Sequence, residues 1–321
     1  MALAIGVAFV GNNFRFKQES VTALGPDGEL AGVLTLPPNG QARGLVVMVH
    51  GDGPIDATQQ GLYSPWFEGA AASGFATLSW SKPGVDESNG DWLSQSMDDR
   101  AAEVTAVIDW AKRNDDVPTQ TIVLWGASQA GWVLPKVVNS REDIDGVVAV
   151  APAINWLRQG RFNLESELDH EGADAPDIAR AIKDSNRTRK LLDREAPYED
   201  YIDSTTSRDP MTEDRWSFVQ RNFRADAVRD LTASASRKTP VHLMVGTHDR
   251  NVDVTETEKV YRSTLGSYLT VTHLEGTHTL ARPIMEENDL VGFATGTMWP
   301  RALLAPRAIA DYRTFLKTGL A

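Results

Sequence analysis

Residues 121–132 read Thr121-Ile-Val-Leu-Trp125-Gly126-Ala127-Ser128-Gln129-Ala130-Gly131-Trp132, an apolar run that ends in small residues around one serine. This pattern predicts a buried strand, a sharp turn that raises the Ser128 hydroxyl above the sheet edge, and a helix. Such a turn strains the serine backbone and leaves room only for small side chains two positions to either side. Gly126 meets that requirement, and Ala130 followed by Gly131 nearly does. A serine in an ordinary first turn of a helix is the alternative.

The amino-acid composition excludes several kinds of partner and of catalytic site. The chain has 321 residues, of which 41% are hydrophobic, a size at which one domain with an insertion is as reasonable as two domains. The formal net charge of −12 argues against a nucleic-acid partner, because phosphate binding needs a basic surface. The absence of cysteine excludes disulfides, zinc–thiolate sites and a thiol nucleophile. Serine is left for any covalent catalysis.

The first ten residues, Met1 to Val10, are apolar but too few to span a bilayer. They lack the basic region that opens a signal peptide, and no later apolar stretch approaches the length of a membrane helix. We therefore predict a soluble, cytoplasmic protein with no membrane partner. The sequence leaves the oligomeric state open, a homo-oligomer included.

Short apolar runs alternate with helical patterns along most of the chain. Residues 16–24 and 30–36 flank a Gly-Pro-Asp-Gly turn and predict an antiparallel hairpin. Runs suited to strands follow at residues 45–49, 75–80, 121–125, 147–151, 240–246 and 269–274, and those at 45–49, 121–125 and 147–151 suit buried strands. Together they predict a mostly parallel sheet flanked by helices, with ligands binding beyond the carboxyl ends of the strands.

The loop after the first of these buried runs is His50-Gly51-Asp52-Gly53-Pro54. Its glycines let backbone N–H groups point into a cleft. A nucleotide-binding loop is excluded, because no lysine followed by serine or threonine stands at P-loop spacing. His50 alone resembles a base or a metal ligand, but a histidine that braces the loop is the simpler interpretation.

The serine turn and this loop together resemble the α/β-hydrolase superfamily of serine hydrolases. The turn matches the family's G-x-S-x-G pattern except that Ala130 replaces the second glycine, and the loop matches its H-G-x-G pattern. Residues 82–88 resemble an R-G-x-G-x-S segment of the family, to which we give a structural role. The resemblance implies an α/β-hydrolase fold, with a mostly parallel central sheet, flanking helices and an inserted helical cap.

The resemblance also implies the residues that carry out catalysis. Ser128 matches the nucleophile, and Gly246-Thr247-His248-Asp249 fits the G-x-x-D loop that holds the acid. His278 stands in the loop after the last predicted strand, where the family places its base. The order Ser, Asp, His is the order of this family.

Two residues near Asp249 have other interpretations. Asp253 is a rival acid, but it is better suited to cap a helix that begins near Val254. His248 has no second cluster at metal-ligand spacing, so we predict no metal site.

The family pattern places the oxyanion hole at the backbone N–H groups of Gln129 and of Asp52 or its neighbour Gly51. A carboxylate that faces a developing oxyanion would raise the barrier. We therefore expect the Asp52 side chain to point away or to bind a cationic part of the substrate.

Hydrolases of this family commonly carry a cap between two strands of the core. We accordingly predict a core at residues 1–153 and 239–321 and a helical cap at residues 154–238. Helical patterns at residues 180–183, 190–194 and 216–220 predict short helices, separated by Pro176, Pro197 and Pro210. The candidate substrate contacts, for which packing of cap onto core is the alternative, are Trp132, Trp156, Phe162, Trp216, Phe218 and Phe223.

These residues predict a serine hydrolase that needs no cofactor and cleaves an ester-type bond of a small-molecule acyl substrate. An aminopeptidase or amidase, a thioesterase and an acyltransferase use the same residues, and the acidic Asp52 keeps the aminopeptidase open. A ligand-binding protein that has kept the scaffold is the alternative from another class. Intact serine, aspartate and histidine argue against it.

Overall fold

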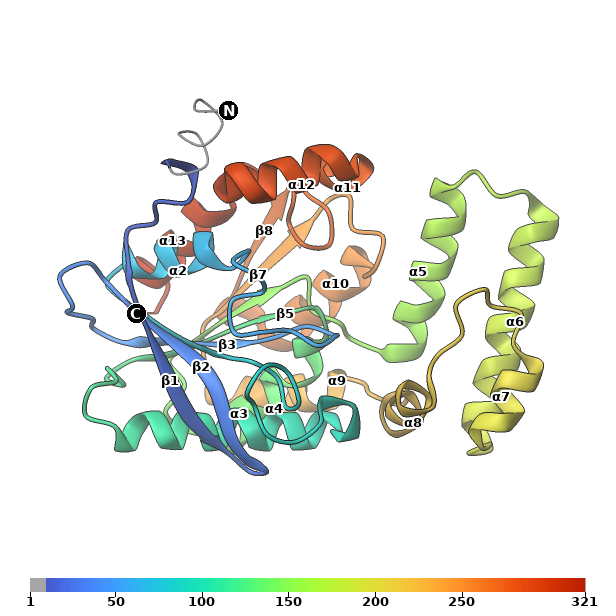
Figure 1. Cartoon of the computed structure of the whole chain (residues 1–321), viewed down its shortest axis with the longest axis horizontal. Coiled ribbons are helices and arrows are strands. Elements are labelled where there is room, and N and C mark those ends of the chain that lie inside the picture. Colours follow the sequence, from blue (N-terminus) through green and yellow to red (C-terminus); the bar gives the residue numbers. More distant parts are fainter. Residues whose placement is uncertain (1–9, 321) are drawn as a thin grey trace.

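The computed structural model describes residues 10–320. The apolar run at the start of the chain, apart from Val10, lies outside this range. The described strands form one eight-stranded sheet in the order β1-β2-β4-β3-β5-β6-β7-β8 (Figure 1). Their bounds are β1 Lys17–Gly25, β2 Gly28–Leu36, β3 Leu45–Val49, β4 Ala76–Trp80, β5 Ile122–Ala127, β6 Gly146–Val150, β7 Val241–Gly246 and β8 Leu269–Leu274.

The sheet is mixed but mostly parallel. β1 and β2 form the predicted hairpin, with Gly25 opposite Gly28, and β2 pairs antiparallel with β4. The remaining neighbours pair in parallel. Every residue of β3, β4, β6 and β7 is buried, which explains why these strands are continuous apolar runs rather than alternating ones. The predicted α/β-hydrolase fold is confirmed.

Helices cover both faces of the sheet. Val47 of β3 packs in one apolar cluster with Val107, and its neighbour Val46 packs in the other with Phe67 and Tyr312. In Figure 1, α3, α4 and α9 lie below β3 and β5, while α2 and α13 lie above β3. The bounds of the flanking helices are α2 Ser64–Ala71, α3 Met97–Arg113, α4 Leu134–Ser140, α9 Val228–Ser234, α10 Val254–Leu265, α11 Pro283–Glu287, α12 Asp289–Met298 and α13 Ala308–Thr318. Between residues 10 and 320, none of the helices has the length and apolar character needed to cross a membrane.

α3 begins at the capping box Ser96 to Asp99. The Ser96 hydroxyl accepts the Asp99 N–H at 3.1 Å, and the Asp99 carboxylate accepts the Ser96 N–H at 2.8 Å. These bonds satisfy two backbone donors that the first turn of a helix leaves free. The helix then buries Val104, Val107 and Ile108 against the sheet and leads the chain toward β5.

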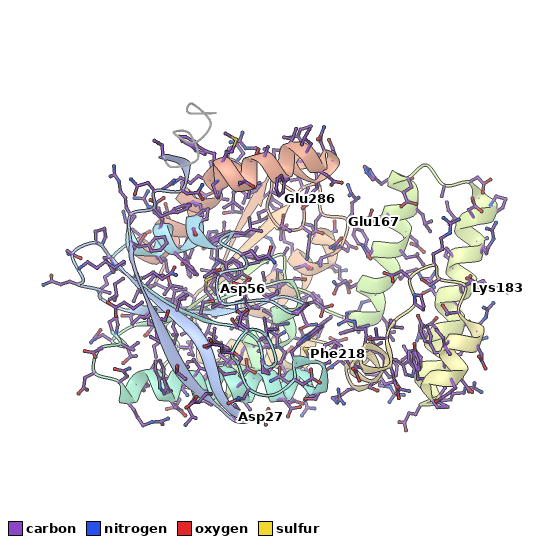
Figure 2. All side chains as sticks on the ribbon, viewed as in Figure 1. Asp27, Asp56, Glu167, Lys183, Phe218 and Glu286 are labelled. Carbon is purple, nitrogen blue, oxygen red and sulfur yellow. The ribbon has the colours of Figure 1, made fainter. Side chains whose placement is uncertain are left out.

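A helical insertion separates β6 from β7. It contains α5 Trp156–His170, α6 Ala175–Asp193, α7 Tyr198–Ser204 and α8 Glu213–Asn222, followed by α9. Figure 1 shows α5, α6 and α7 standing away from the sheet, whereas α9 lies beside α4 in the core layer. In Figure 2, Phe218 lies where the insertion meets the core, and Lys183 lies toward its far side. The division at residues 154 and 238 stays a prediction.

One helix of the insertion differs from expectation. Residues 180–194 were predicted to hold two short helices, but residues 175–193 form the single helix α6. Pro176 does not interrupt it, because Pro176 occupies the first turn, where the N–H that proline lacks would have no partner. Pro197, by contrast, stands at the N-cap of α7, where it separates two helices as predicted.

Candidate active site

Ser128 stands directly after β5, at the start of a short 3₁₀ turn (Ser128–Trp132) that leads into α4. Its backbone φ is 53°, in the left-handed region that residues other than glycine rarely adopt. The sharp turn expected from the sequence is therefore present. Strained backbone of this kind is characteristic of functional sites, where the surrounding structure holds it in place.

The glycines around Ser128 leave room for close packing of neighbouring atoms. A Cβ on Gly126 would lie 2.8 Å from the Ala130 Cβ and 3.0 Å from Leu134. A Cβ on Gly131 would lie 2.4 Å from the carbonyl oxygen of Ala153. The Ala130 methyl fits because Gly126, which faces it, has no side chain. The position that needs a second glycine is residue 131, which packs against the Ala153 carbonyl, rather than residue 130.

Replacing Gly126 with alanine should therefore destabilise the protein. The new methyl group meets side chains that are themselves buried, and such overpacking costs about 1–3 kcal/mol in free energy of unfolding. Gly160→Ala is a matched control, since Gly160 lies inside α5 with no atom within 4 Å of the added methyl. Alanine there is expected to be neutral or to stabilise by up to about 1 kcal/mol. Urea unfolding measures both variants, and equal stability of the two would contradict the packing account.

Three residues that the sequence singled out lie together at the carboxyl edge of the sheet. The Ser128 Oγ lies 2.9 Å from the Nε2 of His278, and the His278 Nδ1 lies 2.9 Å from the Asp249 Oδ2. Asp249 follows β7, and His278 follows β8. The side chain of Asp249 is 0% exposed and that of His278 is 13% exposed, so the acid is shielded from water.

The Asp249 carboxylate is fixed on its other side as well. Its Oδ1 accepts the backbone N–H groups of Asn251 at 2.8 Å and Val252 at 2.9 Å. The rival Asp253 instead accepts the N–H groups of Thr255 and Glu256 at the start of α10, the capping role that we expected.

The loops that carry the acid and the histidine pack backbone to backbone. A Cβ on Gly246 would lie only 2.2 Å from the carbonyl oxygen of Thr277, so only glycine allows this approach. The His248 N–H donates to the Gly276 carbonyl at 2.9 Å, which ties the two loops together. Glu286 accepts the hydroxyl of Thr277 at 2.5 Å and braces the loop from α11.

His50 braces the glycine loop from beneath. Its Nε2 lies 2.5 Å from the Trp80 carbonyl oxygen, which can only accept, so Nε2 carries the proton. Its ring stacks on Tyr63, whose hydroxyl lies 3.3 Å from Nδ1. Burial lowers the pKa of His50 to about 3, with Lys82 and Arg100 lowering it further and the bond to Trp80 opposing the shift. The side chain is thus a neutral structural group.

This buried histidine should make the fold sensitive to acid. The unfolded chain binds a proton at His50 below about pH 6.5, whereas the folded protein, with a pKa of about 3, does not. The free energy of unfolding should therefore decrease as the pH is lowered from about 6.5 to about 3, by up to about 1.4 kcal/mol per pH unit. His242, whose pKa is lowered to about 4 by burial, adds to the slope in the same direction.

His50→Gln isolates the effect, because glutamine still donates to the Trp80 carbonyl but does not titrate. Urea unfolding from pH 7 to pH 4 should show a shallower decline for this variant than for the wild type, whatever its stability at pH 7. Parallel pH profiles would show that His50 does not carry the effect. His242→Gln is measured in the same way and should also show a shallower loss of stability toward low pH than the wild type.

Asp52 has a partner that the sequence did not reveal. Both of its oxygens accept the guanidinium of Arg215 from α8, one at 3.0 Å, and its Oδ1 also accepts the side-chain amide of Gln129 at 3.0 Å. Burial works to raise the pKa of Asp52, but Arg215, Lys82 and the Gly53 N–H outweigh it and hold the pKa below its usual value. The expected cationic partner is thus a residue of the protein's own insertion.

The predicted aromatic contacts pack partly at the junction of insertion and core and partly within the insertion. Trp132 stacks on Trp156 at 5.0 Å, and Trp156 lies 6.1 Å from Phe218. Trp216 stacks on Tyr201 at 4.6 Å. The side chains of Trp216, Phe218 and Phe223 are buried in this packing, while Phe162 is half-buried. The contacts give these residues a packing role, and substrate contact stays a prediction.

A polar cavity of about 350 Å³ opens between α5 and the loops after β7 and β8. Asp249 and Thr277 line it together with Asp169 and His170 of the insertion, but Ser128 and His278 do not. The cavity therefore borders Asp249 but not Ser128.

Comparisons with known proteins agree with this geometry. Residues 40–280 match the family described as serine aminopeptidase, S33. Among solved structures, an esterase of Pyrococcus furiosus is 17% identical, with 88% of this chain and 92% of the other covered and a TM-score of 0.57. The acylaminoacyl peptidase of Pyrococcus horikoshii is 14% identical, with 97% and 43% covered and a TM-score of 0.57. Dienelactone hydrolase of Anabaena variabilis is 17% identical, with 90% and 99% covered and a TM-score of 0.50.

These structures share the fold at low identity, and among curated proteins no match was found. The family match, however, spans most of the chain and includes the serine turn, the glycine loop and both loops of the acid and the histidine. The chain belongs to the serine aminopeptidase, S33, family of α/β-hydrolases.

Proposed function

We propose that this hydrolase cleaves an ester-type acyl bond through an acyl-enzyme on Ser128, with His278 as general base and Asp249 as orienting acid. One observation carries the proposal: His278 lies 2.9 Å from the Ser128 Oγ on one side and 2.9 Å from Asp249 on the other. A serine hydroxyl becomes a useful nucleophile only when a neighbouring imidazole accepts its proton. The carboxylate holds that imidazole in the tautomer with the proton on Nδ1.

The reaction follows from these contacts. Ser128 attacks the acyl carbon as His278 takes its proton, and the carbonyl oxygen becomes negatively charged. Backbone N–H groups of Gln129 and of Asp52 or Gly51 stabilise that charge. His278 returns the proton to the leaving alcohol, then activates a water molecule that releases the acid. No cofactor takes part in these steps.

The ion pair between Asp52 and Arg215 favours an ester over a substrate with a free amine. An unpaired Asp52 carboxylate near Ser128 would have favoured binding of a substrate with a positively charged amine, but this carboxylate is already paired with Arg215. The family description names an aminopeptidase, however, and this makes a peptidase the second candidate. A thioesterase and an acyltransferase use the same residues and differ in the leaving group or the acceptor.

A substrate panel tests the proposal. Wild-type protein and Ser128→Ala are assayed with p-nitrophenyl butyrate, an aminoacyl p-nitroanilide and a butyryl thioester. We expect the ester to be cleaved with the highest kcat/KM and an initial burst of one p-nitrophenol per chain. Cleavage of the anilide alone would replace the esterase by the peptidase. Equal rates in the wild type and the variant would refute both.

A further inference from the structure

Two cationic side chains are buried beneath the glycine loop. Lys82, just after β4, is 2% exposed, and Arg100 on α3 is 5% exposed. Burying a charge is costly unless it is paired, yet within residues 10–320 neither side chain has a carboxylate oxygen within 4.0 Å. The polar head group of each must therefore be satisfied by other groups.

Those groups are two consecutive backbone carbonyls of the glycine loop. The Arg100 Nη2 donates to the carbonyl of His50 at 2.7 Å, and the Lys82 Nζ donates to the carbonyl of Gly51 at 2.6 Å. In a trans peptide the N–H points opposite to the C=O. Holding these carbonyls therefore turns the N–H groups of Gly51 and Asp52 away from the cations.

The glycine loop also lies beside the nucleophile. A Cβ on Gly51 would lie 3.4 Å from the Ser128 Cβ, so the loop lies against the serine. Among the described residues, no hydrogen bond outside the helices and strands engages the N–H of Asp52 or of Gln129. Both donors are thus free for a substrate oxygen.

Arg100 also connects the two halves of this arrangement. Its Nη1 donates to the side-chain oxygen of Gln129 at 2.5 Å, and the amide nitrogen of Gln129 donates to Asp52 at 3.0 Å. One guanidinium therefore fixes the loop through the His50 carbonyl and residue 129 through its side chain. The planar fork of arginine suits this double role, which a lysine at the same place would not perform.

We propose that Lys82 and Arg100 are positioning residues that aim the oxyanion-hole donors by holding the His50 and Gly51 carbonyls. The inference rests on the proposed function, since it gives those N–H groups a use. Neither side chain touches the reacting atoms. The charge of the Arg100 guanidinium also favours the negative oxygen of the tetrahedral intermediate more than the neutral substrate, and holding the carbonyls aims donors at that same oxygen. Both residues therefore act on kcat rather than on KM.

Lys82→Met tests the inference, because methionine fills similar space without charge or donor. We expect kcat for p-nitrophenyl butyrate to fall by about 10²–10³ with KM nearly unchanged. Inhibition by trifluoromethyl heptyl ketone, which forms a charged tetrahedral adduct with serine, should weaken by a similar factor. Binding of methyl heptyl ketone, which stays trigonal, should not change. Lys112→Met, which removes an exposed lysine paired with Asp143, should match the wild type throughout.

The outcomes separate the two proposals. Wild-type protein that neither turns over the ester nor binds the trifluoromethyl ketone more tightly than the methyl ketone would refute the proposed function, and the positioning role with it. An active wild type together with a folded Lys82→Met that keeps kcat within twofold, or loses affinity for both ketones alike, would overturn the positioning role alone.

A second variant keeps the test decisive if Lys82→Met does not fold. Arg100→Lys keeps the buried charge but cannot bond the His50 carbonyl and Gln129 through one fork. The same loss of kcat and of trifluoromethyl ketone affinity is expected, and an unchanged kcat in this variant would overturn the inference. Circular dichroism and the Tm report folding for every variant.

Discussion

Asp249→Asn is expected to lower kcat by about 10⁴ while the protein keeps its fold. The reason lies in the two N–H groups of Asn251 and Val252, which donate to Oδ1 of Asp249. An asparagine must place its oxygen there, so its NH₂ group faces the Nδ1 of His278. Nδ1 then becomes an acceptor and the ring proton moves to Nε2, where it blocks transfer from Ser128.

The matched control for this change is Asp253→Asn. Asp253 lies four residues away and caps α10, and asparagine is an equally good N-cap. We expect its kcat and its stability to equal those of the wild type. Steady-state kinetics with p-nitrophenyl butyrate measures both variants. Full activity of Asp249→Asn, or a comparable loss in Asp253→Asn, would contradict the assignment of the acid.

Ser128→Ala should lower kcat by about 10⁶, because it removes the hydroxyl that forms the proposed acyl-enzyme. The folded structure should persist, since alanine tolerates the left-handed backbone about as well as serine does. Ser128→Gly should be equally inactive but more stable than Ser128→Ala. Glycine adopts a φ of 53° without the steric cost, which is about 1–2 kcal/mol.

Stopped-flow kinetics and urea unfolding check these two variants together. The loss of activity and the gain in stability have separate causes, since one concerns the hydroxyl and the other the backbone. A Ser128→Ala variant with more than about 1% of wild-type kcat would show that another nucleophile acts. A Ser128→Gly variant less stable than Ser128→Ala would show that the turn is not strained.

The sheet could be predicted because its causes are local, whereas the choice of Asp249 and His278 came from the resemblance to the hydrolase family. Continuous apolar runs indicate strands covered on both faces, and the carboxyl ends of parallel strands meet at one edge. The loops of Ser128, Asp249 and His278 therefore lie at one edge of the sheet, and the strand order β5-β6-β7-β8 brings them together. Gly246 illustrates the limit, because its place in the pattern was visible but its contact with the Thr277 carbonyl was not.

The contacts made by the insertion could not be read in the same way. Arg215 is one of many charged residues on polar helices, and nothing local distinguishes it from its neighbours. Its pairing with Asp52 depends on where α8 docks, which is set by the packing of aromatic side chains such as Trp156 and Phe218. The span of α6 was missed for a different reason, since the polar residues 184–189 interrupt the apolar pattern but continue the helix.

Lys82 shows how a motif can be recognised while its contact stays hidden. The segment after β4 was given a structural role from its likeness to a family pattern. Only the folded chain shows that the Lys82 Nζ reaches a carbonyl of a loop 31 positions earlier in the sequence. Long-range contacts of this kind shape the glycine loop, and they follow from the strand order rather than from local residue patterns.

The central claim is that Ser128 is an activated nucleophile, and a fluorophosphonate probe tests it most directly. Wild-type protein, Ser128→Ala and Asp253→Asn are incubated with the probe and analysed by intact mass and peptide mapping. We expect a single adduct on Ser128 in the wild type and in Asp253→Asn, and none in Ser128→Ala. A folded wild type that takes up no probe, or takes it up at another serine, would contradict the account.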